Sequence, residues 1–386
     1  MPAGDIFYIF CTYRTTLLLR PVVPMVLLFP IYSIVMGTVM LGPWVLGHEC
    51  GHGSFAPHKP CVKIAGKSLD MNDVVGWVVH SALLVPFWSW QYSHAKHHKY
   101  TNHLVLGETH CPNLEGDPVV GDTFPLLRII GMHLGFPAYL LGFSRAKTQA
   151  DLKTPMDRSK WADHLHSGTV QSTTLSRGSV FDQLSGPCTD MLMCVRISCT
   201  CAGSQTMPDD WRIEMSTVGC IIHLLILAAN DAPDEAGWKF WYFGPYLIVN
   251  AWLVLYTWLH HTHPDVPHYG SDTFSFVRGA LATIDRPYPW IIDHLHHHIG
   301  STHVAHHLCS DVPHYRAVEL REALRPVLGQ YYLFDPQPMY SAVWQVATEC
   351  HHVEGITGVQ YYRHKEHRSE AFLAKEEAEK ESAKTK

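Results

Sequence analysis

Long uncharged apolar blocks dominate the hydrophobic pattern of this 386-residue chain. The longest covers residues 21–47, which contain no Asp, Glu, Lys or Arg. A helix of about 20 apolar residues crosses a hydrocarbon core of about 30 Å, so this block can span a membrane even if Pro30 and Pro43 bend it. A buried helix of a soluble protein is usually shorter and has a polar face. The pattern therefore predicts a membrane-spanning helix.

Two further apolar segments, residues 215–230 and 240–259, flank a turn-forming sequence at 231–235. This arrangement predicts a helical hairpin through the bilayer, with a short first arm. Residues 74–90 and 124–143 are apolar but are interrupted by histidine, proline or arginine. We expect both to lie in the membrane interface, where partial spans are tolerated if protein covers them.

The remaining segments are more polar. Residues 147–185 have no apolar period and are expected to form a solvent-exposed loop. From Arg316 the pattern indicates a soluble cap, and residues 363–386 form a charged tail without expected chemistry. We expect residues 1–362, including this loop and the cap, to form one domain. Its start has no basic leader followed by a small-residue cleavage site, so we expect no removed signal peptide.

Composition narrows the possible functions. The formal net charge of -6 comes without a basic face or stripe, which argues against nucleic acid as a partner. The 11 cysteines show no Cys-x-x-Cys ligand spacing, and we expect them to be mostly reduced and buried. Histidine is the unusual component. The chain has 29 histidines, as many as lysine and arginine together, and many of them occur in clusters.

Three histidine clusters each follow an apolar segment. They read His-Glu-Cys-Gly-His from His48, His-Ala-Lys-His-His from His94 and His-Val-Ala-His-His from His303. Residues three or four apart share one helix face, where two imidazoles can bind the same metal ion. Eight such imidazoles are too many for one tetrahedral zinc and could surround two ions. Because imidazole binds iron, zinc and copper, the ligand type leaves the metal open.

The predicted spans are compatible with a single site. One crossing, residues 21–47, precedes the first cluster, and the second cluster shares its side if the two interfacial segments do not cross. The two crossings of the hairpin then return the chain to that side before the third cluster. Isolated histidines are instead expected to make ordinary hydrogen bonds: His58, His80, His133 and His223.

The first cluster taken alone permits other chemistry. The residues His48, Glu49 and His52 also match the zinc-protease pattern, in which the glutamate is a general base. An intramembrane zinc metalloprotease would need a third ligand, usually an aspartate, from a later helix, and residues 240–259 contain none. A metal transporter, a further alternative, would place polar residues within its spans rather than just beyond them.

Together, the three clusters resemble the histidine boxes of the membrane fatty acid desaturases. The resemblance is closest to the acyl-lipid Δ12 and omega-3 desaturases of plants, fungi and algae. Further matching stretches include residues 261–264, 278–286 and 327–332. The similarity covers nearly all of residues 30–145 and 240–362.

The resemblance implies a non-haem di-iron site that uses dioxygen to remove two hydrogens from an unactivated methylene pair. It implies that the box histidines are ligands, joined by one histidine from the segment before the third box, for which we choose His261 over His263. Glu49 is implied to orient an imidazole, and no other catalytic side chain is expected. The implied iron ligands are His48, His52, His94, His97, His98, His261, His303, His306 and His307.

The family's fold and the apolar blocks together imply an all-α integral membrane protein. A few transmembrane helices would carry a cytosolic, histidine-rich, di-iron helical cap. The implied substrate is an acyl chain of a membrane lipid. Ala305 occupies a position that is alanine in many Δ12 enzymes and more often isoleucine in plant omega-3 enzymes. We therefore expect conversion of oleoyl to linoleoyl, with omega-3 desaturation as the alternative.

The expected partners follow from the electron requirement. Each turnover with dioxygen needs two external electrons, and the chain has neither a Gly-rich nucleotide-binding turn nor the His-Pro-Gly-Gly haem motif of a fused cytochrome b5 domain. The resemblance thus implies a separate donor, cytochrome b5 or alternatively ferredoxin. Because no plastid transit peptide is visible, we expect the endoplasmic reticulum, with the boxes facing the cytosol, and a plastid membrane as the alternative.

Two regions depart from the family pattern. Most members have two spanning helices before the first box, whereas residues 5–19 are short and contain Arg14, so we expect a truncated amino end. Residues 179–216 look unlike the family and read as foreign sequence. A short helix leading into the hairpin would be expected there.

Overall fold

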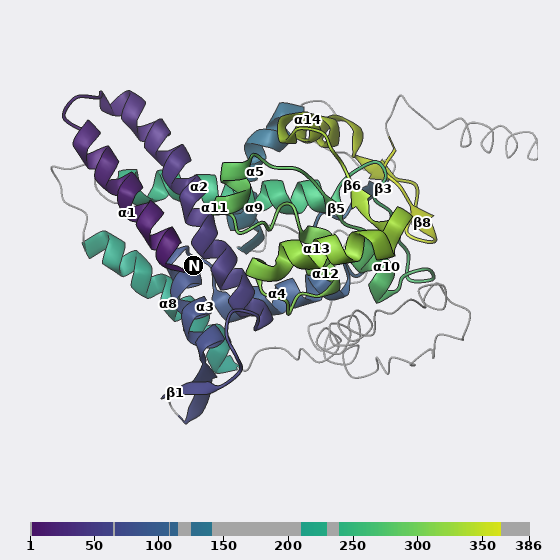
Figure 1. Cartoon of the computed structure of the whole chain (residues 1–386), viewed down its shortest axis with the longest axis horizontal. Coiled ribbons are helices and arrows are strands. Elements are labelled where there is room, and N and C mark those ends of the chain that lie inside the picture. Colours follow the sequence, from purple (N-terminus) through teal and green to yellow (C-terminus); the bar gives the residue numbers. More distant parts are fainter. Residues whose placement is uncertain are drawn as a thin grey trace, which may run out of the picture.

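The computed structural model is built mainly of helices (Figure 1). The residues it describes are 2–64, 66–107, 109–114, 125–140, 210–229 and 239–363. The predicted loop at 147–185 and the predicted charged tail beyond Arg363 lie outside these ranges.

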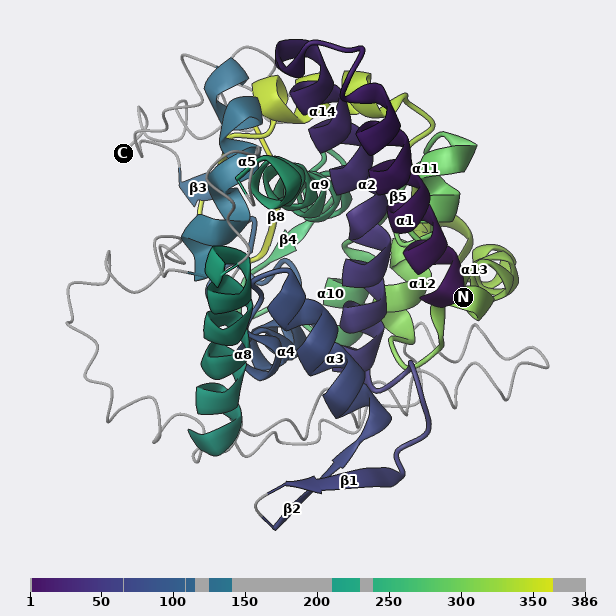
Figure 2. The same cartoon turned by 90° about the vertical axis from the view of Figure 1, so that its left-hand side faces the viewer.

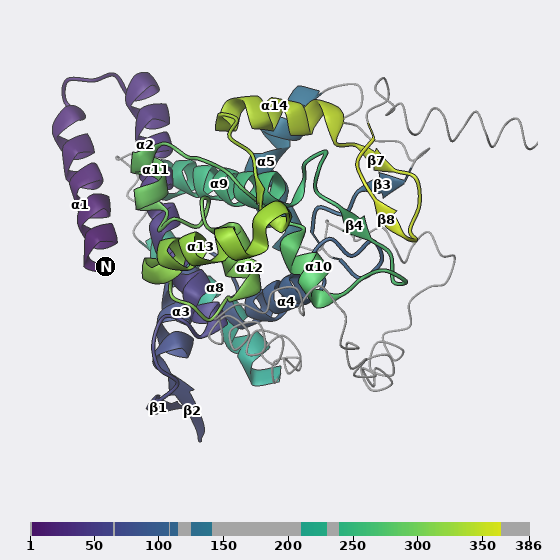
Figure 3. The same ribbon diagram turned by 45° about the vertical axis from the view of Figure 1, so that its right-hand side comes forward.

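Helix α2 (Met25–His52) is the apolar block recognised in the sequence, and it continues through the first histidine cluster. Gly53 ends it in a left-handed conformation, with φ 73°, which glycine adopts without steric cost. Helix α1 (Pro2–Leu19) lies antiparallel beside α2 (Figures 1 and 3). By length and composition, α2 and Trp211–Ala229 are the two described helices that could cross a membrane.

The predicted segment at 74–90 is two helices, α3 (Met71–Ala82) and α4 (Phe87–Lys99). Leu84 between them has a φ of 55°, which is incompatible with a continuous helix, and Pro86 precedes the first turn of α4. Helix α4 therefore runs in a different direction from α3 and carries the second histidine cluster into the interior.

The predicted arms of the hairpin are helices α8 (Asp210–Ala229) and α9 (Gly244–His261), but they do not form a hairpin. Helix α8 packs against α3 and α4, whereas α9 follows the π-helix η3 (Lys239–Phe243) and packs across α2 and α5 (Pro125–Leu140). Figure 2 shows α9 end-on while α2 and α8 run across the view. The hairpin prediction is wrong because apolar length does not determine helix direction.

The first turns of α8 lie inside the predicted atypical segment 179–216, yet they belong to the packed fold. The Trp77 indole N–H donates to the Met215 carbonyl oxygen at 2.8 Å. The Ser216 hydroxyl oxygen accepts from the Trp88 backbone N–H at 3.0 Å. These turns are therefore part of the packed fold, and the rest of the segment lies outside the described residues.

The C-terminal half wraps around the end of α9. It consists of α10 (Phe276–Leu281), α11 (Trp290–Leu295), α12 (His303–Leu308), α13 (His314–Leu328), the 3-10 helix η4 (Gly329–Tyr331) and α14 (Met339–Glu349). Helix α12 carries the third histidine cluster, is buried along its whole length and packs on α10 and α13. Helix α14 packs on α5 and α9. The third cluster is thus enclosed by protein.

Within the described ranges, four short strand pairs occur that the all-α prediction missed. They are β1 (Pro60–Ile64) with β2 (Lys67–Asp70), β3 (Asn113–Leu114) with β7 (His352–Val353), β4 (His268–Tyr269) with β8 (Val359–Gln360), and β5 (Ile284–Asp285) with β6 (Leu333–Phe334). The β1–β2 hairpin is antiparallel and projects from the body (Figure 2). The pairs β3–β7 and β5–β6 are parallel. Two-residue strands are too short for a period-2 pattern, so the sequence does not reveal them.

Candidate metal centre

The nine predicted ligands lie on four helices whose ends meet in the interior. They are His48 and His52 on α2, His94, His97 and His98 on α4, His261 on α9, and His303, His306 and His307 on α12. Each is buried or half-buried. His48 and His52 lie at the end of α2, and His261 is the last residue of α9, so two long helices bring these side chains to the site.

The imidazoles form two groups, and within each group one ring nitrogen per residue lies within 4.8 Å of the others. The five-histidine group is His48, His52, His94, His98 and His306, and the three-histidine group is His97, His261 and His307. His303 borders the three-histidine group, because its Nε2 atom lies 3.3 Å from His261 Nε2 and 3.2 Å from His307 Nε2. The structure thus brings all nine predicted ligands together around two centres.

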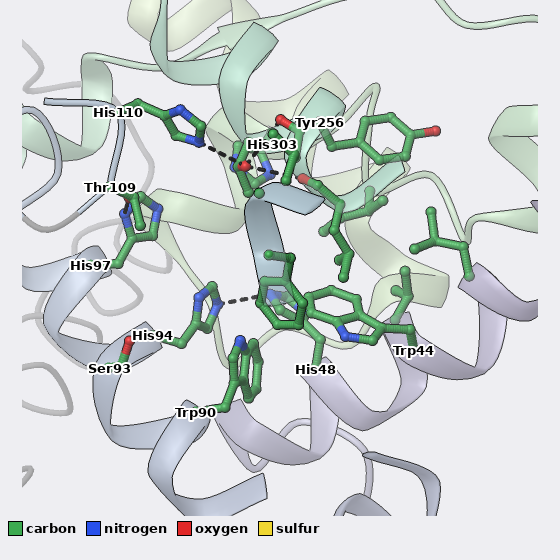
Figure 4. Close-up of a pocket in the computed structure, with 18 residues that line it drawn as sticks. Trp44, His48, Trp90, Ser93, His94, His97, Thr109, His110, Tyr256 and His303 are labelled. Atoms are coloured by element: carbon green, nitrogen blue, oxygen red, sulfur yellow. Dashed lines mark hydrogen bonds between the residues drawn. The ribbon is translucent and has the colours of Figure 1, made fainter. Parts of the chain in front are cut away.

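His94 occupies the middle of the five-histidine group. Its Nε2 atom lies 2.9 Å from His48 Nε2, 3.0 Å from His52 Nε2 and 3.1 Å from His98 Nε2. Figure 4 shows His94 and His48 facing each other from α4 and α2. The Trp90 ring stacks on the His94 ring, with centroids 4.6 Å apart, and limits its rotation. Trp90 is four residues before His94, a helical spacing that the sequence already contains.

The hydrogen bonds of the three-histidine group show that its nitrogens fit a metal ion. The Thr101 hydroxyl donates to the His97 carbonyl oxygen at 2.7 Å, so its oxygen accepts from Nδ1 of His307 at 3.3 Å. The proton of His307 is then on Nδ1, and the Nε2 lone pair faces His303 Nε2. A neutral imidazole that presents its Nε2 lone pair is the form in which histidine binds a metal cation. The donor set therefore fits a bound cation.

The protonation state of these side chains agrees with that interpretation. Burial lowers the pKa of His98 well below the usual value of 6.5, and the neighbouring imidazoles lower it further. Burial has the same effect on the pKa of His307 and His303. All three rings are thus neutral at physiological pH, which is the form that binds a metal.

Glu49 lies behind the five-histidine group. Its Oε1 atom is 3.6 Å from His48 Nδ1. Its Oε2 atom accepts from the His314 backbone N–H at 2.8 Å and from the Ser54 hydroxyl at 3.0 Å. The Oε2 atom thus makes two hydrogen bonds, and Oε1 lies beside His48, a placement compatible with the predicted orienting role of Glu49.

Sequence reasoning missed three threonines that orient the three-histidine group. Thr101, Thr109 and Thr283 place a hydroxyl 3.3, 2.9 and 3.3 Å from Nδ1 of His307, His97 and His261, respectively. Thr101 follows His97 by four residues and could have been found from helical spacing. The other two threonines come from loops, and no sequence pattern connects them to the clusters.

The other histidines considered in the sequence lie outside both groups. His263, the alternative ninth ligand, accepts from the Asp265 backbone N–H through Nδ1 at 3.1 Å. His58 pairs with Asp70 at 2.7 Å. The remaining isolated histidines, for which we expected ordinary contacts, are likewise absent from both groups: His80, His133 and His223.

An apolar cavity of about 290 Å³ borders the cluster (Figure 4). Its polar side is formed by histidines of both groups, including His48, His94 and His97. Apolar side chains from α2, α5 and α9, such as Leu41 and Leu253, line the rest. The cavity can therefore hold an apolar chain against both centres.

These features define a helical protein with an apolar cavity beside two buried groups of histidines that could each hold a metal ion. A family model described as fatty acid desaturase matches residues 24–173 and 196–337, and the chain belongs to that family. It is accordingly an oxidoreductase of the desaturase type rather than a zinc metalloprotease or a metal transporter. The match resumes at residue 196, inside the segment 179–216 that we predicted to be foreign. The foreign segment was therefore predicted to extend too far toward its C-terminal end.

Several curated relatives are similar over most of the chain. The Δ12 fatty acid desaturase of Mortierella alpina is 34% identical over 362 residues, covering 87% of this chain and 77% of the relative. The Δ12-acyl-lipid desaturase of Punica granatum is 36% identical over 343 residues, covering 86% and 74%. The omega-6 fatty acid desaturase of Glycine max, endoplasmic reticulum isozyme 1, is 33% identical over 372 residues, covering 93% and 82%.

Proposed function

We propose that this protein converts an oleoyl group of a membrane lipid to a linoleoyl group by introducing the cis Δ12 double bond. The observation that carries the proposal is the apolar cavity that ends on histidines of both groups. The names of the three relatives described above support the Δ12 position. No feature of the described residues favours the omega-3 alternative.

The nine histidines would hold two iron ions, with His303 completing the three-histidine group. When bound, the irons supply the activation of dioxygen that removal of two hydrogens requires. The protein excludes water from the site and fixes the orientation of the imidazoles. Trp44 stacks on His48 with centroids 5.6 Å apart, and Trp90 stacks on His94, so both rings keep their direction beside the cavity. Apolar walls exclude water from the reacting chain.

The exposed apolar side chains support a membrane location. Leu126, Ile130 and Leu134 form one exposed ridge of α5, at intervals of four residues. Helix α14 packs on α5 and exposes Tyr340 and Trp344, the residue types that favour membrane interfaces. We place α2 and α8 across the bilayer, with the segment of η3 and α9 as the returning crossing. Helices α5 and α14 then lie in the interface and the histidine cluster on the cytosolic side. Ready labelling of an Ile130→Cys variant in membranes by an impermeant maleimide would contradict this placement of α5.

The reaction needs an electron donor. Removal of two hydrogens with reduction of dioxygen to two waters consumes two electrons and two protons from outside the substrate. We place the donor on a separate protein, cytochrome b5 in the endoplasmic reticulum, with ferredoxin in a plastid as the alternative. Purified protein that turns over with a chemical reductant but gains nothing from added cytochrome b5 would argue against this donor.

Expression in a yeast that makes oleate but no linoleate tests the activity. We expect a new 18:2 Δ9,12 fatty acid, absent from cells that carry the empty vector. A parallel culture fed linoleate tests the alternative, because an omega-3 enzyme would form α-linolenate there and no linoleate in the unfed culture. Absence of both products, with the protein present in membranes, would contradict the proposal.

A further inference from the structure

A buried carboxylate on α1 contacts the turn that precedes the third histidine cluster. Asp5 is only 5% exposed, and its Oδ2 atom lies 3.1 Å from His297 Nε2. Neighbouring side chains of α1 are apolar and face outward, with Ile6 67% and Phe7 61% exposed. A buried carboxylate is costly without a polar partner, so the contact with His297 explains why this single acidic side chain points inward.

His297 connects Asp5 to the five-histidine group through a chain of short contacts. The His297 ring packs against the His314 ring, with centroids 4.7 Å apart. The His314 backbone N–H donates to Glu49 Oε2 at 2.8 Å, and Glu49 Oε1 lies 3.6 Å from His48 Nδ1. Three residues, His297, His314 and Glu49, thus connect the Asp5 carboxylate to the ring of His48.

The turn that contains His297 has an unusual backbone. His297 and His298 have φ values of 53° and 62°, in the left-handed region that few side chains other than Asn, Asp and Gly adopt. His298 Nδ1 lies 2.7 Å from Asp293 Oδ2, while Asp5 contacts His297. Because this conformation persists only where its surroundings enforce it, the two carboxylates hold the turn that leads into His303.

Helix α2 makes room for this contact at Gly42. A Cβ atom at Gly42 would lie 2.9 Å from Asp5 Oδ1 and 2.7 Å from the Leu295 carbonyl oxygen. Both distances are too short for a real contact. Glycine therefore allows the Asp5 carboxylate to pass α2 and reach His297.

From this geometry we propose that Asp5 is a positioning residue for the metal centre. It holds His297, and through it both the turn before α12 and the His314–Glu49 contact, in the arrangement that directs His303 and His48 toward the metal. The inference rests on the proposed iron site. Asp5 touches neither the metal ligands nor the cavity, so its effect is expected on metal retention and turnover, not on substrate binding.

Iron loss to a ferrous chelator from the purified, full-length protein tests the proposal. Replacing residues that orient metal ligands typically lowers metal affinity about 10–100-fold, so Asp5→Ala should lose iron about tenfold faster than wild type. The kcat should fall while KM stays constant. Asp5→Asn, which keeps a polar atom near His297, should restore most of the retention. The matched control is Ile6→Ala, which shortens the adjacent exposed side chain and should behave like wild type.

A double-mutant cycle with His297→Asn decides whether the effect passes through the observed contact. Asparagine tolerates the left-handed backbone but is too short to reach Asp5. The double variant should lose iron no faster than the single variants, since both remove the same contact. Additive losses, or an Asp5→Ala variant that matches Ile6→Ala, would overturn the proposal. If Asp5→Ala does not accumulate, His297→Asn alone takes its place in the comparison with Ile6→Ala, because it removes the same contact from the other side. If the purified wild-type protein contains no iron, that result would instead contradict the proposed function.

Discussion

The two histidine groups differ in the number of their ligands and in what supports them. The five-histidine group surrounds His94 and has one carboxylate behind it, Glu49, while His98 Nδ1 has no hydrogen-bond partner among the described residues. In the three-histidine group, every Nδ1 atom faces a threonine hydroxyl. An ion bound by five imidazoles would depend little on any single ligand, because four others remain. An ion held by three imidazoles, or by four with His303, would depend more on the orientation of each ligand.

This difference makes the smaller group the more sensitive of the two. Each of its histidines supplies about a third of the nitrogen ligands, and each depends on one neighbouring hydroxyl. The comparison therefore predicts unequal iron retention after chemically identical substitutions in the two groups, even where activity is lost in both.

The largest effect is expected from removing a ligand of the three-histidine group. His97→Ala should lower linoleate formation in yeast by at least about 100-fold, beyond the usual effect of residues that only orient ligands. His306→Ala, in the five-histidine group, should also abolish the product. Both variants should remain in membranes, because apolar helices carry the fold. His133→Ala lies outside both groups and serves as the control, and full product formation by His97→Ala would refute the assignment of that ligand.

Metal content separates the groups more sharply than activity. His261→Ala removes one of three close ligands, so the purified variant should contain about one iron per chain. His52→Ala removes one of five and should retain more iron than His261→Ala, because four imidazoles remain. Elemental analysis of both variants provides the measurement. Equal iron content would mean that the two groups do not differ as the geometry indicates.

A smaller effect is expected from the threonines. Thr283→Val keeps the side-chain shape and removes the hydroxyl that faces His261 Nδ1, so iron in the three-histidine group should dissociate about tenfold faster. The second iron should be unaffected. Thr348→Val on α14, which loses hydrogen bonds to the Trp344 and Gln345 carbonyl oxygens of its own helix, is the control. Chelator kinetics that resolve two phases test the prediction, and a uniform change in both phases would contradict it.

The sequence identifies the histidines that the structure brings together, but not how they divide into two groups. Spacings of three and four residues identify helical pairs such as His94 and His98 without knowledge of the fold. His97 and His98, however, are adjacent in the chain and belong to different groups, as do His306 and His307. Successive residues on a helix point about 100° apart, so neighbouring imidazoles diverge toward separate ions. Which distant imidazole each one meets depends on how four helices approach, and no local pattern encodes that.

Local sequence patterns likewise predict that a helix exists but not how it packs. The apolar block at 21–47 predicts the existence of α2, because length and absence of charge are local properties. The break near Leu84 and the crossing of α9 over α2 are tertiary features, and the sequence-based hairpin at 215–230 and 240–259 is wrong for that reason. Asp5 had no visible role until the fold brought it to His297.

The central claim is that the nine histidines hold two iron ions in two unequal groups. Elemental analysis of the wild-type protein, purified with its native metal, tests it most directly. The account predicts two irons per chain, and it predicts that chelation removes one of them faster than the other. A single zinc per chain, or a single iron that no added ferrous salt increases, would contradict it.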